Sequence, residues 1–351
     1  MLSGGKLLDQ GLYGCIFTPP LVCKDKKKQA AIEKEDDLQL SKLILTEYAI
    51  REEDVATLIR KIPLWKNYFV VSESMCEPAV KQTEKDLPLC VSLNQERLSK
   101  FRLLVMPYGG ESLNSHRFTL SSFDFLEFAK HFIQAGALLN LFGVVHRDIH
   151  GGNILVDKDD VPRIIDFNLA IFVETDDMVG QLEHQYSPSL SQEPPDSALV
   201  NAIKFGYNPQ QVMASILSKR PSIKRISALL GVPVTKMRAQ LEAFYQKSKS
   251  VRAGDDEEWF KVYWRTIDSW AIGVNLVEFI YKLSLWPEYK STLDRAFVTL
   301  YPVLRRLCAV NPLERMDCVQ ALYALDPKHF IIRKYAGAWL AKVGTGQVQG
   351  Q

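Results

Sequence analysis

The feature that most constrains this chain is the stretch "HRDIHGGNIL" at residues 146–155. It places Asp148 five residues before Asn153, and three apolar residues follow the amide directly. A second short apolar segment, "RIIDF", brings Asp166 thirteen residues after Asn153. Two short strands around a turn would bring these three polar groups together. An aspartate that only caps a turn explains one of them, whereas the whole combination indicates a functional site.

The order of these residues resembles the catalytic loop H-R-D-x-x-x-x-N of the protein kinases and the metal-binding Asp that follows it. The resemblance implies that Asp148 orients an acceptor hydroxyl and takes its proton. It also implies that Asn153 and Asp166 hold Mg²⁺, which neutralises charge on the phosphates of ATP.

Three further stretches agree with this resemblance. "GLYG", from Gly11 to Gly14, followed two residues later by Ile16, resembles the end of a glycine-rich loop whose bare backbone approaches phosphates. "DSWAIG" resembles the start of a kinase helix whose first residue, here Asp268, holds the catalytic-loop backbone. "NPLER" resembles a late motif with a structural arginine, here Arg315. Because four motifs occur in the family's order over nearly the whole chain, it is identified as a member of the protein kinase superfamily.

The apolar pattern predicts a strand-rich first part and a mainly helical second part, and the kinase resemblance implies an α+β, bilobal protein kinase-like fold. Strands are expected within 7–17 (a hairpin), 38–45, 68–71 and 101–106, and a helix over 47–62. Helices are expected over 121–143 and 267–283, with two short strands around the turn "DKDDVP". We therefore predict a small antiparallel β-rich lobe with one helix over 1–108, a larger mainly helical lobe over 109–340 with a basic helical insertion at about 200–260, and a flexible tail over 341–351.

The lysine that anchors the nucleotide phosphates has two candidates. Lys42 lies on the predicted strand "LQLSKL", just before a helix that carries glutamates. Lys34 in "AAIEK" is the alternative, but a V-A-I-K alignment would put Glu33 in the lysine position. We expect Lys42, paired with Glu52 on the inner face of the helix, with Glu53 as the other possible partner. The stretch "PYGGESL" (107–113) resembles a hinge, and adenine is expected to lie against Met106 to Gly109, which includes Tyr108.

Several positions depart from the family pattern. Asp9 replaces the first glycine of the glycine-rich loop, and Asn168 replaces the glycine of D-F-G, where Asn is tolerant of positive φ. His150 stands where protein serine/threonine kinases have Lys, so "HRDIHGGN" also resembles the loop of small-molecule kinases such as the aminoglycoside and choline phosphotransferases. A neutral histidine donates one hydrogen bond to a phosphoryl oxygen. A role for His150 in packing the loop is the alternative.

The A-P-E motif that follows the activation segment of kinases is also altered. Pro188 is followed by Ser189 rather than Glu, so Glu193 is the acid expected to pair with Arg315. This change affects the substrate-docking region more than the phosphate chemistry.

Composition excludes several classes of protein. The chain is 47% hydrophobic and 24% charged, with a formal net charge of +2, as in ordinary globular proteins. No stretch approaches the roughly 20 apolar residues of a membrane span, and the start lacks the apolar core of a signal peptide. The six cysteines form no C-x-x-C pair, so a zinc site is not expected. Cys76 and Cys90 flank a polar loop and are able to approach each other, but we expect free thiols in a reducing compartment.

Residues 201–252 carry ten Lys or Arg and one acid, Glu242. Within them, "SIKRISALLGVPVTKMRAQLEAF" (222–244) predicts a helix, a turn and a second helix. A DNA-reading helix-turn-helix is one interpretation, and a helical insertion with a solvated basic face is the one we favour. Its charge is suited to acidic or phosphorylated partners, or to a weak polyanion or nucleic-acid contact.

The sequence predicts an ATP-dependent serine/threonine protein kinase that uses Mg²⁺ and acts on protein substrates. The layout, including "YGCIFTPPLVCK" and "LLVMPYGG", resembles the serine/threonine kinase-like proteins of large DNA viruses. That resemblance implies a location in the host cytoplasm, or packaging in the virion. The alternatives are a kinase-like binding or virion protein with weak catalysis, and a small-molecule phosphotransferase.

Overall fold

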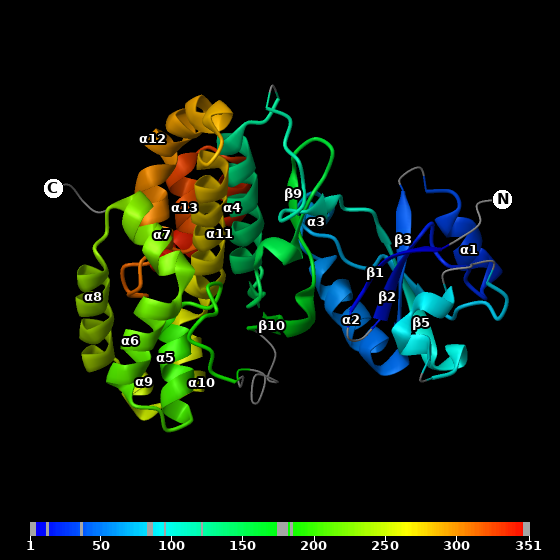
Figure 1. Ribbon diagram of the computed structural model, residues 1–351, viewed down its shortest axis with the longest axis horizontal. Coiled ribbons are helices and arrows are strands. Elements are labelled where there is room, and N and C mark those ends of the chain that lie inside the picture. Colours follow the sequence, from blue (N-terminus) through cyan, green and yellow to red (C-terminus); the bar gives the residue numbers. More distant parts are fainter. Residues whose placement is uncertain are drawn as a thin grey trace. The chain divides into compact units, whose positions relative to one another are not determined.

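The computed structural model describes residues 5–11, 14–35, 38–82, 87–94, 96–120, 122–173, 182 and 185–346. The chain divides into two compact units, drawn in Figure 1. The first comprises Met1–Gly110 with Ile165–Asn168, and the second Glu111–Ile164 with Leu169–Gln351. The first is built on an antiparallel sheet and the second is mainly helical, so the predicted fold class is confirmed.

The first unit is a five-stranded antiparallel sheet in the order β1-β2-β3-β5-β4. Its strands are β1 (Lys6–Gln10), β2 (Gly14–Thr18), β3 (Gln39–Leu45), β4 (Ser74–Cys76) and β5 (Phe101–Pro107). Its helices are α1 (Lys26–Ile32), α2 (Thr46–Ile59) and α3 (Trp65–Tyr68). The predicted hairpin, the strands at 38–45 and 101–106 and the helix after 46 are all present, because each has a clear period of two or of 3.6 residues.

Two expectations for this unit are wrong. No strand forms over 68–71; the chain turns at Leu64, whose φ is 59°, into the short helix α3, and Val70 and Val71 are buried without joining the sheet. The stretch "PPLVCKDKKKQ" (19–29), with two prolines and a lysine run, favours a solvated loop. Its lysines instead begin α1, because the carboxylate of Asp25 caps the helix by accepting from the backbone N–H of Lys27.

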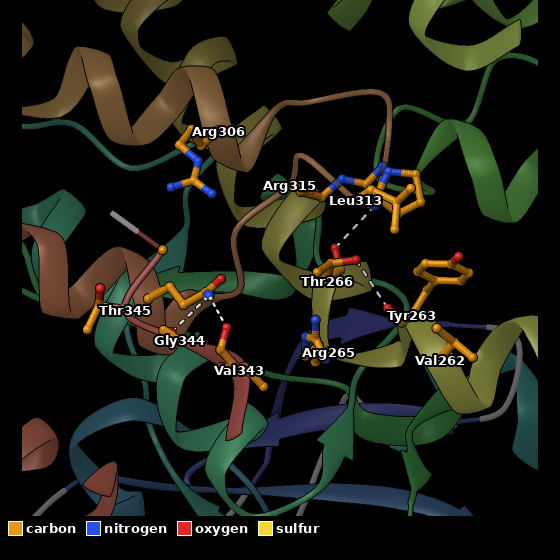
Figure 2. A pocket seen from close by; sticks show the side chains of 13 residues that line it. Val262, Tyr263, Arg265, Thr266, Arg306, Leu313, Arg315, Val343, Gly344 and Thr345 are labelled. Atoms are coloured by element: carbon orange, nitrogen blue, oxygen red, sulfur yellow. Dashed lines mark hydrogen bonds between the residues drawn. The ribbon is translucent and has the colours of Figure 1, made fainter. Parts of the chain in front are cut away.

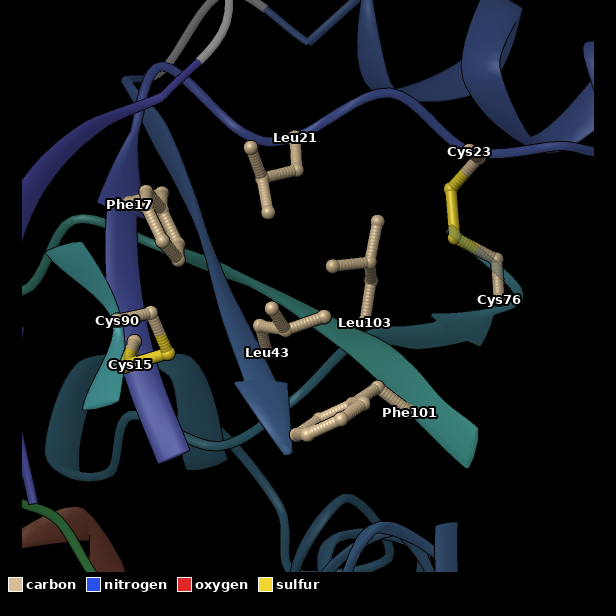
Figure 3. Packing of buried hydrophobic residues seen from close by; sticks show 9 residues of the cluster. All are labelled: Cys15, Phe17, Leu21, Cys23, Leu43, Cys76, Cys90, Phe101 and Leu103. Atoms are coloured by element: carbon tan, nitrogen blue, oxygen red, sulfur yellow. A yellow bond between two sulfur atoms is a disulfide. The ribbon is translucent and has the colours of Figure 1, made fainter. Parts of the chain in front are cut away.

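The core of the first unit contains two disulfides, Cys15–Cys90 and Cys23–Cys76 (Figure 3). The expectation of free thiols is therefore wrong for these four cysteines. The pairs are 75 and 53 residues apart in the chain, and only the folding of the sheet brings their side chains together. Figure 3 shows Leu43 of β3 and the ring of Phe101 of β5 packed between the two bridges.

The second unit contains short strand pairs and a group of packed helices. Its strands are β6 (Glu111–Ser112), β7 (Val144–Val145), β8 (Ile154–Val156), β9 (Pro162–Ile164) and β10 (Ile171–Phe172). Its helices are α4 (Phe125–Leu141), α5 (Pro195–Lys204), α6 (Pro209–Lys219), α7 (Pro221–Leu230), α8 (Val234–Lys247), α9 (Lys249–Ala253), α10 (Asp256–Tyr263), α11 (Ile267–Ser284), α12 (Lys290–Leu307), α13 (Cys318–Leu325), α14 (Phe330–Tyr335) and α15 (Gly337–Val343).

Helix α11 is buried on nearly every side, as its sequence predicts, and packs against α4, α7 and α12. Gly136 on α4 permits this close packing, since a Cβ there would lie 2.4 Å from Ile272 Cδ1 and 2.6 Å from Cys318 Sγ. Cys308 and Cys318 are buried and not disulfide-bonded, and burial raises the pKa of both thiols. These two cysteines act as small core residues.

Helices α7 and α8 confirm the predicted helix, turn and helix, joined at Gly231, whose φ is 62°. A left-handed glycine there ends α7 without strain. The predicted flexible tail begins inside α15, and Gln320 Nε2 donates to the carbonyls of Val343 and Gly344. In the described ranges, no helix combines the length and the apolar character that crossing a membrane requires.

Candidate active site

The backbone of the 146–153 loop is held by a buried carboxylate. Asp268, in the first turn of α11, accepts from the backbone N–H of His146 at 2.6 Å and from that of Arg147 at 2.9 Å. Burial raises the pKa of the Asp268 carboxyl, and the neighbouring His146 and these N–H donors oppose the rise. Arg147 has a φ of 70°, so the loop needs such support to hold its conformation. The role predicted for Asp268 is confirmed.

Asp148 and Asn153 meet across this loop. The Asn153 amide nitrogen donates to the Asp148 backbone carbonyl at 3.0 Å and to its Oδ2 at 3.2 Å. Both bonds use the nitrogen, so the amide oxygen is the atom left to bind a cation, and such oxygens are ligands that Mg²⁺ accepts.

The second carboxylate oxygen of Asp148 has a partner that the sequence did not reveal. Gln192 Nε2 donates to Asp148 Oδ1 at 3.1 Å. Each oxygen of Asp148 therefore accepts from one neutral amide, which fixes the plane of the carboxylate. A cavity of about 260 Å³ reaches this carboxylate, with Leu190 and Pro194 among its apolar lining residues. No motif in the sequence marks Gln192.

His150 is fixed by its own turn. Its Nδ1 accepts from the backbone N–H of Gly152 at 3.0 Å, and its Nε2 lies 3.7 Å from Asp148 Oδ2. Because Nδ1 is an acceptor, a neutral ring carries its proton on Nε2. The side chain is 42% exposed and lines a second cavity of about 280 Å³. His150 thus packs the loop and also presents an N–H donor beside Asp148.

The segment after residue 186 is held by two buried arginines. The expected Glu193–Arg315 pair is wrong: Arg315 Nη2 bonds to Asp196 Oδ1 at 2.6 Å, with both side chains fully buried. Asp196 lies in the first turn of α5 and faces the core, whereas the Glu193 carboxylate precedes the helix and lies 3.8 Å from Arg220. Arg220 also donates to the backbone carbonyls of Pro188 and Glu193, so the residue between α6 and α7 anchors this segment.

In the first unit, the predicted Lys42–Glu52 ion pair is formed. Lys42 Nζ lies 2.7 Å from Glu52 Oε2, and both side chains are mostly buried. Glu53, one residue further along α2, instead pairs with Arg60 at 2.8 Å. Lys34 is exposed just beyond α1. The helical register of α2 therefore selects Glu52 over Glu53.

The expected nucleotide-binding residues lie on the strands beside Lys42. The register places Ile16 of β2 opposite Lys42, and Leu104 of β5 on its other side, two residues before Met106. Tyr108 follows β5, and its backbone N–H donates to the Leu38 carbonyl at 2.7 Å.

The glycines at the turn between β1 and β2 differ in their surroundings. A Cβ at Gly14 would lie 2.4 Å from the Leu43 carbonyl oxygen, whereas Gly11 faces open space. The tip of this turn, residues 12 and 13, lies outside the described residues. Asp9 is exposed and its carboxylate accepts from the backbone N–H of Gln10. This acid, which replaces a family glycine, is therefore turned toward solvent.

Asp166 belongs to the first unit, and its φ of 64° is left-handed. Asn168, expected at that conformation, is not among the described residues with positive φ, so that expectation is wrong. The ring of Phe167 packs edge-on against Phe69 at 5.6 Å and holds the segment.

In the described part of the chain, no three His, Cys, Asp or Glu side chains gather as a metal site, so Mg²⁺ binding would also need amide and phosphate oxygens.

Comparison with known proteins agrees with this geometry. Residues 22–190, nearly half of the chain, match the family model described as protein tyrosine and serine/threonine kinase. This part of the chain is therefore similar to a protein kinase domain. The match includes Lys42, Asp148, Asn153 and Asp166, and the kinase domain model ends two residues before Gln192.

One curated relative shares a short segment with this chain. Over 34 residues, the chain is 56% identical to a protein kinase and PP2C-like domain-containing protein of Oryza sativa subsp. japonica. This segment is 10% of the present chain and only 5% of the relative's length.

Proposed function

We propose that the protein is an ATP-dependent serine/threonine protein kinase that transfers the γ-phosphoryl group of ATP to protein hydroxyls. The observation that carries the proposal is the Asp148 carboxylate, held by the amides of Asn153 and Gln192 on a loop that Asp268 supports. A carboxylate fixed in this way accepts the proton of an approaching hydroxyl.

The residues of the first unit support nucleotide binding. Lys42, oriented by Glu52, places a positive charge on β3 beside Ile16, where it would contact the α- and β-phosphates. Met106 and Tyr108 provide the hinge backbone and apolar surface for adenine.

The donor set suits the magnesium that the family implies. Asn153 of the second unit offers an amide oxygen and Asp166 of the first unit a carboxylate oxygen, and both are hard ligands of the kind that Mg²⁺ accepts. When bound, Mg²⁺ neutralises charge on the transferred phosphoryl group. Asp148, whose oxygens accept from the two amides, is reserved for the acceptor hydroxyl.

His150 is the observation that favours a second candidate, a small-molecule phosphotransferase. Its Nε2 lies beside Asp148 and would donate one hydrogen bond to a phosphoryl oxygen. The buried Arg315–Asp196 pair and the Asp268 network, both based on protein kinase motifs, favour the protein kinase reading.

The decisive experiment incubates the purified full chain with Mg²⁺ and labelled ATP. The acceptors are a peptide library containing serine, threonine and tyrosine, an aminoglycoside, and choline. We expect phosphoserine and phosphothreonine products that depend on Asp148. Labelling of the aminoglycoside or choline alone would establish the small-molecule reading. Binding of Mg·ATP with no more turnover than Asp148→Asn, on every acceptor, would establish a binding protein.

A further inference from the structure

A cavity of about 630 Å³ opens in the second unit (Figure 2). Its lining residues come from the end of α10 and the turn after it, from α12, from α13 and the loop before it, and from the end of α15 and the chain after it. Among the described residues, none from the catalytic loop lines it. Its chemistry is therefore separate from the candidate active site.

Three arginines line this cavity, and they differ in how many hydrogen-bond partners their guanidiniums have within the protein. Arg315 is committed to the fold, because its guanidinium binds Asp196 and the backbone carbonyls of Ala309 and Thr266. The guanidinium of Arg306 makes no hydrogen bond or ion pair within the described ranges. The guanidinium of Arg265 makes no hydrogen bond there either, and its side chain is 40% exposed. Two guanidiniums thus have N–H donors available for a ligand.

The single negative charge of Asp317 does not balance the positive charges of both Arg265 and Arg306. Asp317 Oδ2 lies 3.7 Å from Arg265 Nε, beyond hydrogen-bond distance. Its carboxylate is already used, since Oδ1 accepts from the backbone N–H of Gln320 at 2.8 Å and Oδ2 accepts from Trp339 Nε1 at 3.0 Å. Burial lowers the pKa of Arg306, as expected for a guanidinium short of partners. The cavity therefore carries excess positive charge.

Two exposed apolar side chains lie at one side of the cavity. Val262 and Leu313 are 54% and 61% exposed, and Figure 2 shows both at the same side of the cavity as the ring of Tyr263. The opposite wall is the segment from Val343 to Thr345, which Gln320 holds in place. A ligand that fits would combine an anionic group with an apolar body.

We propose that this cavity binds an organic phosphate monoester through Arg265 and Arg306, with its apolar body against Val262 and Leu313. Two guanidinium forks offer more donors and charge than one carboxylate uses, whereas a phosphate monoester has three acceptor oxygens and a charge of about −1.5 to −2. The phosphate could be carried by a protein side chain or by a small molecule, and the chemistry of recognition is the same.

The test is calorimetric titration of phenyl phosphate into the full chain in a Lys42→Met background, which removes binding at the nucleotide site. Arg306→Gln should weaken binding at least tenfold. The matched control is Arg305→Gln, because Arg305 is the next residue of α12, is exposed, and stacks on Tyr301. It should bind as Lys42→Met alone does. Benzoate, with one charge and two oxygens, should bind at least tenfold more weakly than phenyl phosphate.

Equal affinity of the Arg306→Gln and Arg305→Gln variants would overturn the proposal, as would the absence of phenyl phosphate binding to the Lys42→Met parent. Arg306→Lys keeps the charge but loses the fork, and should lie between the parent and Arg306→Gln. A peptide that contains phosphoserine or phosphotyrosine should compete with phenyl phosphate if the natural source is a protein; lack of competition assigns the site to a small phosphate ester. Binding should persist in Asp148→Asn, so this proposal and the kinase proposal fail independently.

Discussion

The two units of this protein are stabilised in different ways. The first has a small sheet and one long helix, and two disulfides cross its core. The second buries its cysteines as thiols among packed helices, where Gly136 brings α4 close to Cys318. A small unit buries less apolar surface for its size, so covalent links contribute more to its stability.

The two units also build their functional groups differently. The Lys42–Glu52 pair joins residues ten apart, on a strand and the helix that follows it. The groups that orient the loop of Asp148 come from Asp268 and Gln192, which are far away in the sequence. The nucleotide-binding groups thus depend on local structure, and the acceptor-binding groups on long-range packing.

The largest expected effect separates the chemistry of the two units. Asp148→Asn in the second unit should lower turnover by roughly 10² to 10⁴, because an amide does not take the hydroxyl proton. It should leave the affinity for Mg·ATP unchanged. Asp166→Asn in the first unit should weaken Mg²⁺-dependent nucleotide binding as well. Steady-state kinetics and equilibrium binding of ATP test both variants. If Asp148→Asn and Asp166→Asn weaken ATP binding equally, Asp148 does not act in the chemical step alone.

Breaking the buried Arg315–Asp196 pair should destabilise the second unit. Arg315→Ala leaves an unpaired buried carboxylate, which typically costs about 3–5 kcal/mol. The control is Lys290→Ala, which removes an exposed pair with Asp294 and should leave the unfolding midpoint of this unit unchanged. Urea unfolding followed by amide hydrogen exchange shows which unit is destabilised. Loss of exchange protection in the sheet of the first unit before the second unit would contradict this prediction.

Removing a disulfide should act on the first unit alone. Cys15→Ser with Cys90→Ser should lower its free energy of unfolding by roughly 2–5 kcal/mol, since the bridge closes a long loop. A reducing agent should act in the same direction and leave the second unit unchanged, because Cys308 and Cys318 are already thiols. Mass spectrometry of alkylated protein checks the pairing; alkylation of all six cysteines without reduction would refute it.

Neighbouring glutamates on α2 give a sharper comparison within the first unit. Glu52→Gln weakens a charge-assisted bond to Lys42, worth about 1.5–3 kcal/mol, and should lower kcat/KM for ATP about tenfold or more. Glu53→Gln disturbs the pair with Arg60 instead and should preserve kcat/KM. If Glu53→Gln lowers kcat/KM more than Glu52→Gln does, Glu53 is the residue that orients Lys42.

The smallest expected effect tests the long-range support of Asp148. Gln192→Ala removes one hydrogen bond to its carboxylate, a loss of about 0.5–1.5 kcal/mol, and should lower kcat roughly threefold to tenfold. The KM for ATP should stay constant, and Gln192→Glu should be worse because it places a second carboxylate beside the first. A change confined to thermal stability would make Gln192 a structural residue only.

The sequence by itself determined the elements and groups that depend on short-range order. The hairpin, β3 with α2, the buried helix α11 and the pairing of Lys42 with Glu52 follow from periods of two and 3.6 residues. The spacing of Asp148 and Asn153 was likewise sufficient to place them together, because one short turn joins them.

Only the tertiary structure decided the partners of residues far apart in the chain. Folding of the first unit brings the cysteines together in two disulfides. In the second unit, Arg315 binds Asp196 instead of Glu193, and Gln192 donates a hydrogen bond to Asp148. Periodicity shows which face of a strand or helix is buried, but not which residue of another element meets it. Which two residues come into contact depends on how whole helices and strands pack. The same local pattern is compatible with many different partners along the chain, so only the three-dimensional structure identifies the partner.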